Sequence, residues 1–519
     1  MDHFKVRLNQ IIFGMIIAVI VSVVVNQKRS PDNHLNWVYE DKRIEQEKSS
    51  SQLGEVVSDN VGLPRNPEVV ETKIIQPTPT SEVQVNVETP ATGENNPLQP
   101  TPTSEVQINL KPIEPPGDSL VLAHYMPWFK TPEYSGKWQH WNWDPDDDGG
   151  QDPEDLIPKR LNSDDSWDLA AAHQPIIGPY DSTDPHLIEY HLALAWAAGI
   201  DGFVTDWYGP GDVGETDLAF RRMLTTVERW RQEYNFRFFL AITYEEQLLM
   251  QFNDDQTREA NASTHLNYIL TEYTSQASYL HYDKVPLIFY FEAWPDGQAG
   301  LLRPQQLSRV KAELPTFHLM YMGAEQEFLD VSQGFFSWVS GTNEDPNDWG
   351  KDYVDWVYNE MDYRTQKHDL ELNIGSVWPG FDDSKVWGWG SSPRFIARQD
   401  GLVYAQTWEA ALRDQVQRQR ESPSWVQIVT WNDWNEGSEI EPSVEHGATY
   451  LQATQGYAGR YTGRDLSSAA LLIPEAIYRL RKRQPGLAAE AVIAEVYLLF
   501  FNNKFEAAMD RIQAAEQTE

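Results

Sequence analysis

Residues 425–442 read Trp-Val-Gln-Ile-Val-Thr-Trp-Asn-Asp-Trp-Asn-Glu-Gly-Ser-Glu-Ile-Glu-Pro. The apolar run 425–430 predicts a buried strand, and Asp433 and Glu436 follow it three residues apart. Trp431 and Trp434 flank this acidic pair with flat apolar rings. Two carboxyl groups of this kind suit glycosidic bond cleavage, in which one protonates the leaving oxygen and the other acts as base or nucleophile. A polar loop after a core strand is the simpler interpretation of any isolated pair, so the rest of the chain has to decide.

Seven further short apolar runs precede this strand, and amphipathic stretches lie between several of them. The runs are 120–124, 202–205, 236–243, 286–291, 317–322, 335–339 and 373–377, and the amphipathic stretches are 187–198, 218–234, 263–280 and 304–312. Strands that alternate with helices predict a parallel sheet covered by helices. Eight strands over about 340 residues predict an α/β fold of the (β/α)8 TIM barrel type, with insertions.

Aromatic and acidic residues follow six of these predicted strands. They are His124, Tyr125 and Trp128; Asp206, Trp207 and Tyr208; Tyr244, Glu245 and Glu246; Tyr290, Glu292 and Trp294; Trp378; and the stretch from Trp431 to Glu436. In a barrel the active site lies at the carboxyl ends of the strands. A single ring at such a place is more typical of the core, but their gathering at six strand ends favours a carbohydrate-binding surface.

Composition narrows the function classes. The 519 residues carry a net charge of −37, which argues against a nucleic-acid partner because such a partner needs a basic face. The chain has no cysteine, so disulfides and thiolate metal sites are excluded. The histidines show no zinc-binding spacing, and the Gly-rich segment 209–214 lacks the phosphate-binding patterns. We therefore predict no metal and no cofactor.

The N-terminal segment 1–29 predicts a membrane anchor. Its apolar run 11–25 is flanked by Lys5 and Arg7 on one side and by Lys28 and Arg29 on the other. No small-residue cleavage site follows, which favours an uncleaved signal anchor over a signal peptide, the alternative that would give a secreted protein. We expect the acidic domain behind it to be extracytoplasmic, at the cell surface or in the periplasm.

Two further regions flank the predicted barrel domain, residues 118–462. Residues 30–117 are rich in Pro, Thr, Ser and Glu and contain a duplicate, Gln-Pro-Thr-Pro-Thr-Ser-Glu-Val-Gln-Val/Ile-Asn at 76–86 and 99–109, which predicts a disordered linker. Residues 463–519 predict a helical extension, with helices over 468–482, 486–501 and 504–514. Packing of this extension against the barrel is the favoured interpretation, and docking of a partner is the alternative.

An ordered set of motifs over about 120–460 resembles glycoside hydrolase family 99. The motifs are His124-Tyr-Met-Pro-Trp-Phe129, Lys137-Trp-Gln-His-Trp141, Pro175-Ile-Ile-Gly-Pro-Tyr-Asp-Ser-Thr-Asp-Pro185, Ala198-Gly-Ile-Asp-Gly-Phe203, Asp206-Trp-Tyr208, Trp378-Pro-Gly-Phe-Asp-Asp383 and the stretch 431–442. The resemblance implies an endo-acting, retaining α-mannosidase that needs no metal. In that family one carboxylate deprotonates the sugar's own 2-hydroxyl to give a 1,2-anhydro sugar, and the other is the general acid/base.

Carried over by position, the resemblance makes Asp433 the base for the 2-hydroxyl and Glu436 the general acid/base. Together with the residues at the strand ends, it predicts a substrate-binding set, namely Tyr125, Trp128, Trp207, Tyr244, Tyr290, Trp378, Trp431 and Trp434. One position departs from the family, which usually has Glu where this chain has Asp433. The related family 71 of α-1,3-glucanases has Asp there, so an α-linked glycan other than mannan stays open as the substrate.

Two other functions remain open on the sequence alone. A barrel that binds surface glycans without cleaving them would explain the departure at Asp433, whereas the retention of Glu436 speaks against it. A polysaccharide-assembly protein could use the same barrel. The favoured prediction is a membrane-anchored glycosidase that hydrolyses α-linked, mannan-like polysaccharide or oligosaccharide.

Overall fold

The computed structural model describes residues 119–142, 158, 167–211, 215–293, 300–323, 326–340, 348–368, 372–386, 389, 393–417 and 424–517. The predicted membrane anchor, the linker and its duplicate, and Trp294 lie outside the described residues. In the ranges given above, no helix is long and apolar enough to cross a membrane.

Within the described residues, eight parallel strands pair side by side in a closed ring. They are β1 (Ser119–Tyr125), β2 (Gly202–Trp207), β3 (Phe239–Glu245), β5 (Val285–Phe291), β6 (His318–Met322), β7 (Gly334–Phe336), β8 (Leu372–Val377) and β11 (Ser424–Ile428). Pairing of β3 with β5 and of β11 with β1 closes the ring, and the short strand β4 (His281–Tyr282) adds to β5 antiparallel. The predicted (β/α)8 barrel is confirmed, and each of the eight predicted strands overlaps one of these.

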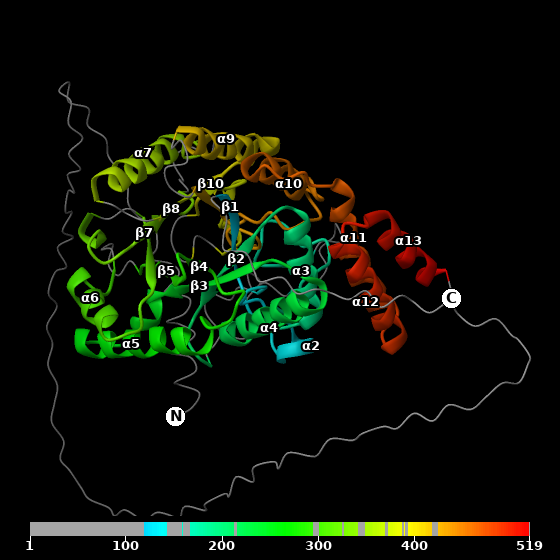
Figure 1. Cartoon of the computed structure of the whole chain (residues 1–519), viewed down its shortest axis with the longest axis horizontal. Helices are drawn as coiled ribbons and strands as arrows, with labels where there is room; N and C mark the ends of the chain where they lie inside the picture. Colours follow the sequence, from blue (N-terminus) through cyan, green and yellow to red (C-terminus); the bar gives the residue numbers. More distant parts are fainter. Residues whose placement is uncertain are drawn as a thin grey trace, which may run out of the picture. The chain divides into compact units, whose positions relative to one another are not determined.

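Helices surround this barrel (Figure 1). They are α3 (Pro185–Ala197), α4 (Thr216–Tyr234), α5 (Asp255–Glu272), α6 (Pro304–Ala312), α7 (Lys351–His368), α9 (Leu402–Gln417) and α10 (Thr449–Thr462), with the short α2 (Pro132–Ser135) after β1. Helix α5 begins eight residues before the predicted stretch 263–280, because the side chain of Asp254 accepts the backbone N–H of Thr257 and so caps the helix at that point.

The core has two layers, which the strands create by alternation. Successive side chains of a strand point to opposite faces, so Leu120 and Leu122 of β1 lie inside the barrel, whereas Val121 and Ala123 pack under the helices. The same alternation decides which residues at the carboxyl ends face the barrel axis. His124, Asp206 and Glu245 share a strand face with residues of the inner layer, so their side chains face the barrel axis. Their neighbours in sequence belong to the outer layer.

The C-terminal extension lies beside α3 and α4 (Figure 1). It consists of the short helix η6 (Ser468–Leu472) and of α11 (Ile473–Arg483), α12 (Leu487–Phe501) and α13 (Phe505–Glu516). Aromatic contacts join α12 to the barrel helices, with Tyr497 4.7 Å from Trp230 and Phe500 5.2 Å from Trp196 between ring centroids. The extension therefore completes the apolar layer on this side of the barrel.

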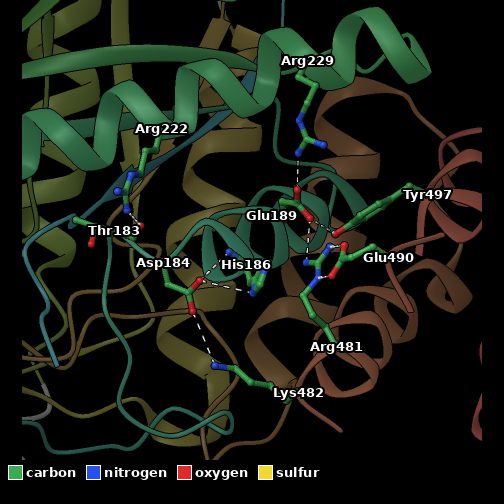
Figure 2. A network of polar contacts seen from close by, with 10 residues as sticks. All are labelled: Thr183, Asp184, His186, Glu189, Arg222, Arg229, Arg481, Lys482, Glu490 and Tyr497. Carbon is green, nitrogen blue, oxygen red and sulfur yellow. Dashed lines mark hydrogen bonds and ion pairs between the residues drawn. The ribbon is translucent and has the colours of Figure 1, made fainter. Parts of the chain in front are cut away.

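An ionic network with a buried central pair, Glu189 and Arg481, fixes the same interface (Figure 2). Glu189 of α3 accepts hydrogen bonds from Arg481 of α11 at 3.0 Å and from Tyr497 at 3.2 Å, and it pairs with Arg229 of α4. Arg481 in turn binds Glu490 of α12 through two hydrogen bonds of 2.7 and 2.8 Å. The side chains of Glu189 and Arg481 are only 10% and 7% exposed, so this pair lies largely out of water.

We expect the substitution Glu189→Gln to lower the free energy of unfolding by about 2–4 kcal/mol, because it leaves a buried guanidinium with part of its counter-charge missing. Urea unfolding followed by tryptophan fluorescence measures the change. The control is Glu475→Gln, which removes a more exposed partner from Arg479 and should cost no more than about 0.5 kcal/mol. Equal effects in the two variants would show that the network contributes nothing beyond a surface ion pair.

Candidate active site

The loop after β11 is tied to the carboxyl end of β1. The backbone N–H of Trp431 donates to the carbonyl of His124 at 2.7 Å. The side chain of Asn432 then brackets Met126, since its Oδ1 accepts the Met126 N–H at 2.7 Å and its Nδ2 donates to the Met126 carbonyl at 2.9 Å. These bonds fix the path of the chain immediately before Asp433.

Asp433 is buried and held on both sides by its own loop. Its backbone N–H donates to Thr430 Oγ1 at 2.8 Å, and its Oδ1 accepts the backbone N–H of Glu436 at 2.9 Å. A short acidic side chain often binds the backbone a few residues on in this way. Burial, followed by the charge of Glu436, raises the pKa of Asp433 well above its ordinary value.

Glu436 reaches farther out, and its side chain is 15% exposed. The indole Nε1 of Trp389 donates to Glu436 Oε1 at 3.2 Å, and Arg394 Nη2 lies 3.6 Å from the same oxygen. Burial is the main reason why the pKa of Glu436 is raised to about 7, and Arg394 works against that rise. At neutral pH this group can therefore both donate and accept a proton.

Two more carboxylates face the same region from the inner side of the barrel. Asp206 Oδ1 at the end of β2 lies 2.6 Å from His124 Nε2, and its charge contributes to the raised pKa values of Asp433 and Glu436. Burial and the nearby Asp206 also raise the pKa of Glu245 at the end of β3. Burial and mutual repulsion thus raise the pKa values of Asp433, Glu436 and Glu245, so these three groups hold their protons to a higher pH than isolated carboxyl groups do.

Four rings that the strand-end pattern assigned to the substrate lie on the outer face of the barrel. Each of them forms a side-chain hydrogen bond to a residue of the surrounding layer. The donor–acceptor distances are 3.0 Å for Tyr125 and His191, 2.9 Å for Trp207 and Asp217, 3.2 Å for Tyr244 and His265, and 2.8 Å for Tyr290 and Glu246. This placement differs from the sugar-lining position expected at the strand ends. It favours a structural role for the four rings, because strand alternation turns them away from the inner carboxylates.

The two tryptophans of the loop that carries Asp433 and Glu436 are also fully buried. Trp431 packs against His191 and Phe203, at 5.6 and 5.3 Å between ring centroids. Trp434 donates from Nε1 to the Tyr180 hydroxyl at 2.9 Å. Both rings are packed in the core and stabilise the loop from its buried side. The indole that contacts the acidic pair belongs to Trp389, which binds Glu436.

Trp128 and Trp378 complete the predicted set. Trp128 stacks on His140 at 4.8 Å and meets Tyr208 edge-on at 6.2 Å. Tyr208 itself interacts electrostatically with Asp433 and Glu436, which places Trp128 near the acidic pair. Trp378 is buried and donates from Nε1 to the carbonyl of Trp349 at 3.3 Å.

Trp389 and Arg394 are not among the residues predicted from the sequence, and Glu245 is predicted only as one of the acidic residues that follow a strand. Trp389 and Arg394 follow no strand or helix period, so no local pattern marks them. The inner position of Glu245 could have been found from the alternation of β3, in which Phe239 and Ala241 share its face. Among the described residues, no group of three or more His, Asp or Glu is arranged to hold a metal ion.

A closed parallel barrel with a buried acidic pair at its carboxyl end defines a class, that of the (β/α)8-barrel glycosidases. The chain belongs to glycosyl hydrolase family 99, because residues 116–457 match the sequence profile of that family. The family resemblance seen in the motifs is thereby confirmed, and the protein is a glycosidase.

The chain is also similar to individual known proteins. The glycoprotein endo-alpha-1,2-mannosidase of Rattus norvegicus is 25% identical over 392 residues, which cover 68% of this chain and 78% of the relative. The glycoprotein endo-alpha-1,2-mannosidase-like protein of Homo sapiens is 23% identical over 342 residues, covering 62% and 68%. Among solved structures, the family 99 endo-alpha-mannosidase from Bacteroides thetaiotaomicron is similar at 19% identity with a TM-score of 0.49, covering 67% of this chain and 98% of that one.

Proposed function

We propose that this glycosidase cleaves α-mannosyl linkages within a polysaccharide or oligosaccharide, with retention of configuration, and that Asp433 and Glu436 carry the reaction. The names of the relatives support the mannosyl substrate. The observation that carries the proposal is the pairing of a buried Asp433 with a Glu436 whose pKa is raised to about 7. A general acid works best when its pKa lies near the operating pH.

In the first step Asp433 takes the proton from the 2-hydroxyl of the sugar, and the 2-oxygen attacks the anomeric carbon. The glycosidic bond breaks, and its oxygen leaves with the proton of Glu436. In the second step Glu436, now ionised, removes a proton from water as the water opens the 1,2-anhydro ring, and Asp433 returns its proton to the 2-oxygen. Each step inverts the anomeric carbon, so the product keeps the configuration of the substrate.

The fixed geometry of Asp433 bears on its departure from the family. Its Oδ1 is committed to the backbone N–H of Glu436, so we assign the other carboxylate oxygen as the base. An aspartate side chain is short enough to make this bond within its own loop, which places the carboxylate relative to Glu436. We infer that the loop of this chain is built around an aspartate and that the shorter side chain is compatible with the same chemistry.

We also propose the organisation that the sequence predicts around the barrel. Segment 1–29 would anchor the chain in a membrane, residues 30–117 would act as a spacer, and the barrel of residues 118–462 with its extension 463–519 would act outside the cytoplasm. The apolar run 11–25 and the repeated Pro-Thr segments support this arrangement.

The substrate is tested by incubating the purified enzyme with α-mannans and α-glucans of defined linkage and determining the product masses. We expect internal cleavage of an α-mannan, seen as oligosaccharides of several sugar units early in the reaction. Cleavage of α-1,3-glucan alone would move the substrate toward that of family 71. Binding of glycans without any released product over long incubation would instead support a glycan-binding barrel.

A further inference from the structure

A small hairpin packs directly on the loop that carries Glu436. It is formed by β9 (Phe381–Asp382) and β10 (Phe395–Ile396), which pair antiparallel. The backbone N–H of Asp382 donates to the carbonyl of Glu436 at 2.7 Å. The next residue, Gly437, has φ of +56°, and a Cβ there would lie 2.9 Å from the Asp382 carbonyl oxygen, so only glycine permits this approach.

Arg398, just after β10, strengthens the same contact. Its Nη2 donates to the carbonyls of Gly437 and Glu439 at 3.0 and 2.9 Å, and it forms an ion pair with the Glu439 side chain at 2.6 Å. The guanidinium also lies over the ring of Tyr450, 4.5 Å from its centroid. The hairpin and the loop that carries Glu436 are therefore held together at Glu436 and at the residues that follow it, Gly437 and Glu439.

Arg394 brings a positive charge of this hairpin toward Glu436, but Asp383 holds the guanidinium. Asp383 is fully buried, and its Oδ2 accepts from Arg394 Nε at 2.8 Å and pairs with Nη2 at 2.6 Å. Its Oδ1 accepts the backbone N–H of Arg394 at 2.6 Å. The guanidinium carbon of Arg394 also lies over the ring of Phe381, 4.7 Å from the ring centroid. Arg394 Nη2 consequently stops 3.6 Å from Glu436 Oε1, beyond ordinary hydrogen-bond distance.

The charge around Glu436 is otherwise acidic. The titratable groups of the described residues that face it are Asp433 of its own loop, Asp206 and Tyr208 at and after the end of β2, Glu245 at the end of β3, and Asp383 and Arg394 of the hairpin. Without a cation these carboxylates would keep Glu436 protonated too strongly for it to act as a base. With the guanidinium in full contact, a charge-assisted hydrogen bond would hold Glu436 ionised and unable to act as an acid.

We propose that Arg394 and Asp383 are positioning residues for the acid/base, and that Asp383 keeps the guanidinium at a distance from Glu436 at which this group can both give and take its proton. The inference rests on the proposed function of Glu436 as the general acid/base. Arg394 supplies the positive charge, and Asp383 determines how much of it reaches Glu436. Removing one or the other should therefore act in opposite directions.

The test is the pH dependence of kcat/KM on an α-mannan, which reports ionisations of the free enzyme. In Arg394→Gln the neighbouring carboxylates are no longer offset, so the alkaline limb, where the acid loses its proton, should move up by about half a unit to one unit. In Asp383→Asn the guanidinium is released toward Glu436, so the limb should move down by a similar amount. Arg394→Lys keeps the charge and should leave the limb closer to that of the wild type.

A purely structural role would lower kcat/KM in both variants without opposite shifts of the limb, and that result would overturn the inference. Should Asp383→Asn fail to fold, Arg394→Gln decides alone, since a limb that is unchanged or lower contradicts the proposal. Glu436→Gln separates this inference from the proposed function. Full activity in Glu436→Gln would contradict the proposed function. Loss of activity in Glu436→Gln, without opposite shifts of the alkaline limb in the hairpin variants, would contradict only the role of the hairpin.

Discussion

Glu436→Gln is expected to lower kcat/KM on an α-mannan by about 10²–10⁴-fold, the usual contribution of a general acid or base. The amide keeps the size of the side chain and can still accept the hydrogen bond from Trp389, but it can neither donate the proton to the leaving oxygen nor take one from water. Removing a charge from an acidic cluster should not destabilise the fold. Initial rates from reducing-end release, together with thermal unfolding, separate chemistry from stability.

A substrate with a better leaving group sharpens this experiment. An aryl α-glycoside needs little protonation, so formation of the anhydro sugar should recover in Glu436→Gln far more than cleavage of the natural linkage does. Glu506→Gln, which alters an exposed residue of α13, is the matched control and should behave as the wild type. Equal activity of Glu436→Gln and this control on α-mannan would remove Glu436 from the mechanism.

Asp433→Asn is expected to cost a similar factor, about 10²–10⁴-fold in kcat/KM, because the base for the 2-hydroxyl is lost. The structure makes this substitution unusually informative. An asparagine Oδ1 can accept the Glu436 N–H as the aspartate does, so the loop should keep its geometry and thermal stability should stay near that of the wild type. A loss of activity at unchanged stability therefore reports on chemistry.

The alternative for Asp433 is that it serves only to hold the loop. In that case Asp433→Asn would keep most of the activity, and Asp433→Ala, which removes the acceptor, would lower both stability and activity. Asp433→Glu returns a carboxylate of the length usual in the family and is expected to retain more activity than Asp433→Asn. Kinetics and melting temperatures of the three variants discriminate between the two roles.

The strands of the barrel were predictable because each is a short apolar run bounded by polar stretches. Such a run reflects the burial of the strand itself, so it is visible in the local sequence. Asp433 and Glu436 follow the last predicted strand. They were therefore assigned to the site, because the active sites of barrels lie at the carboxyl ends of the strands. The two residues stay predictions as catalysts, but their burial and raised pKa values agree with that use. The sequence also predicted the C-terminal helices to within a few residues.

The face of each strand-end residue was harder to predict, and the reason is physical. In β2 the sequence offers Asp206 and Trp207 side by side, and alternation sends one inward and the other outward. The aromatic residue, Trp207, was predicted to bind substrate only because it lies at the end of the strand. Val204, two residues before Asp206, belongs to the inner layer, so Asp206 and not Trp207 faces inward.

The support around Glu436 could not be predicted at all. Trp389 and Arg394 reach it from a hairpin that is distant in sequence and has no periodic pattern of its own. Their position depends on how the hairpin packs on the loop that carries Glu436, through Gly437 and Arg398 in particular. Contacts of this kind arise from tertiary packing, which a single sequence does not display.

The most direct test of the account is the anomeric configuration of the product that the wild-type enzyme first releases from an α-mannan, followed by proton NMR from the start of the reaction. We expect the α-hemiacetal to appear first and then to equilibrate with the β form, because two inversions at the anomeric carbon give net retention. Initial release of the β-hemiacetal, or no release of reducing ends from any α-mannan, would contradict the proposed mechanism for Asp433 and Glu436.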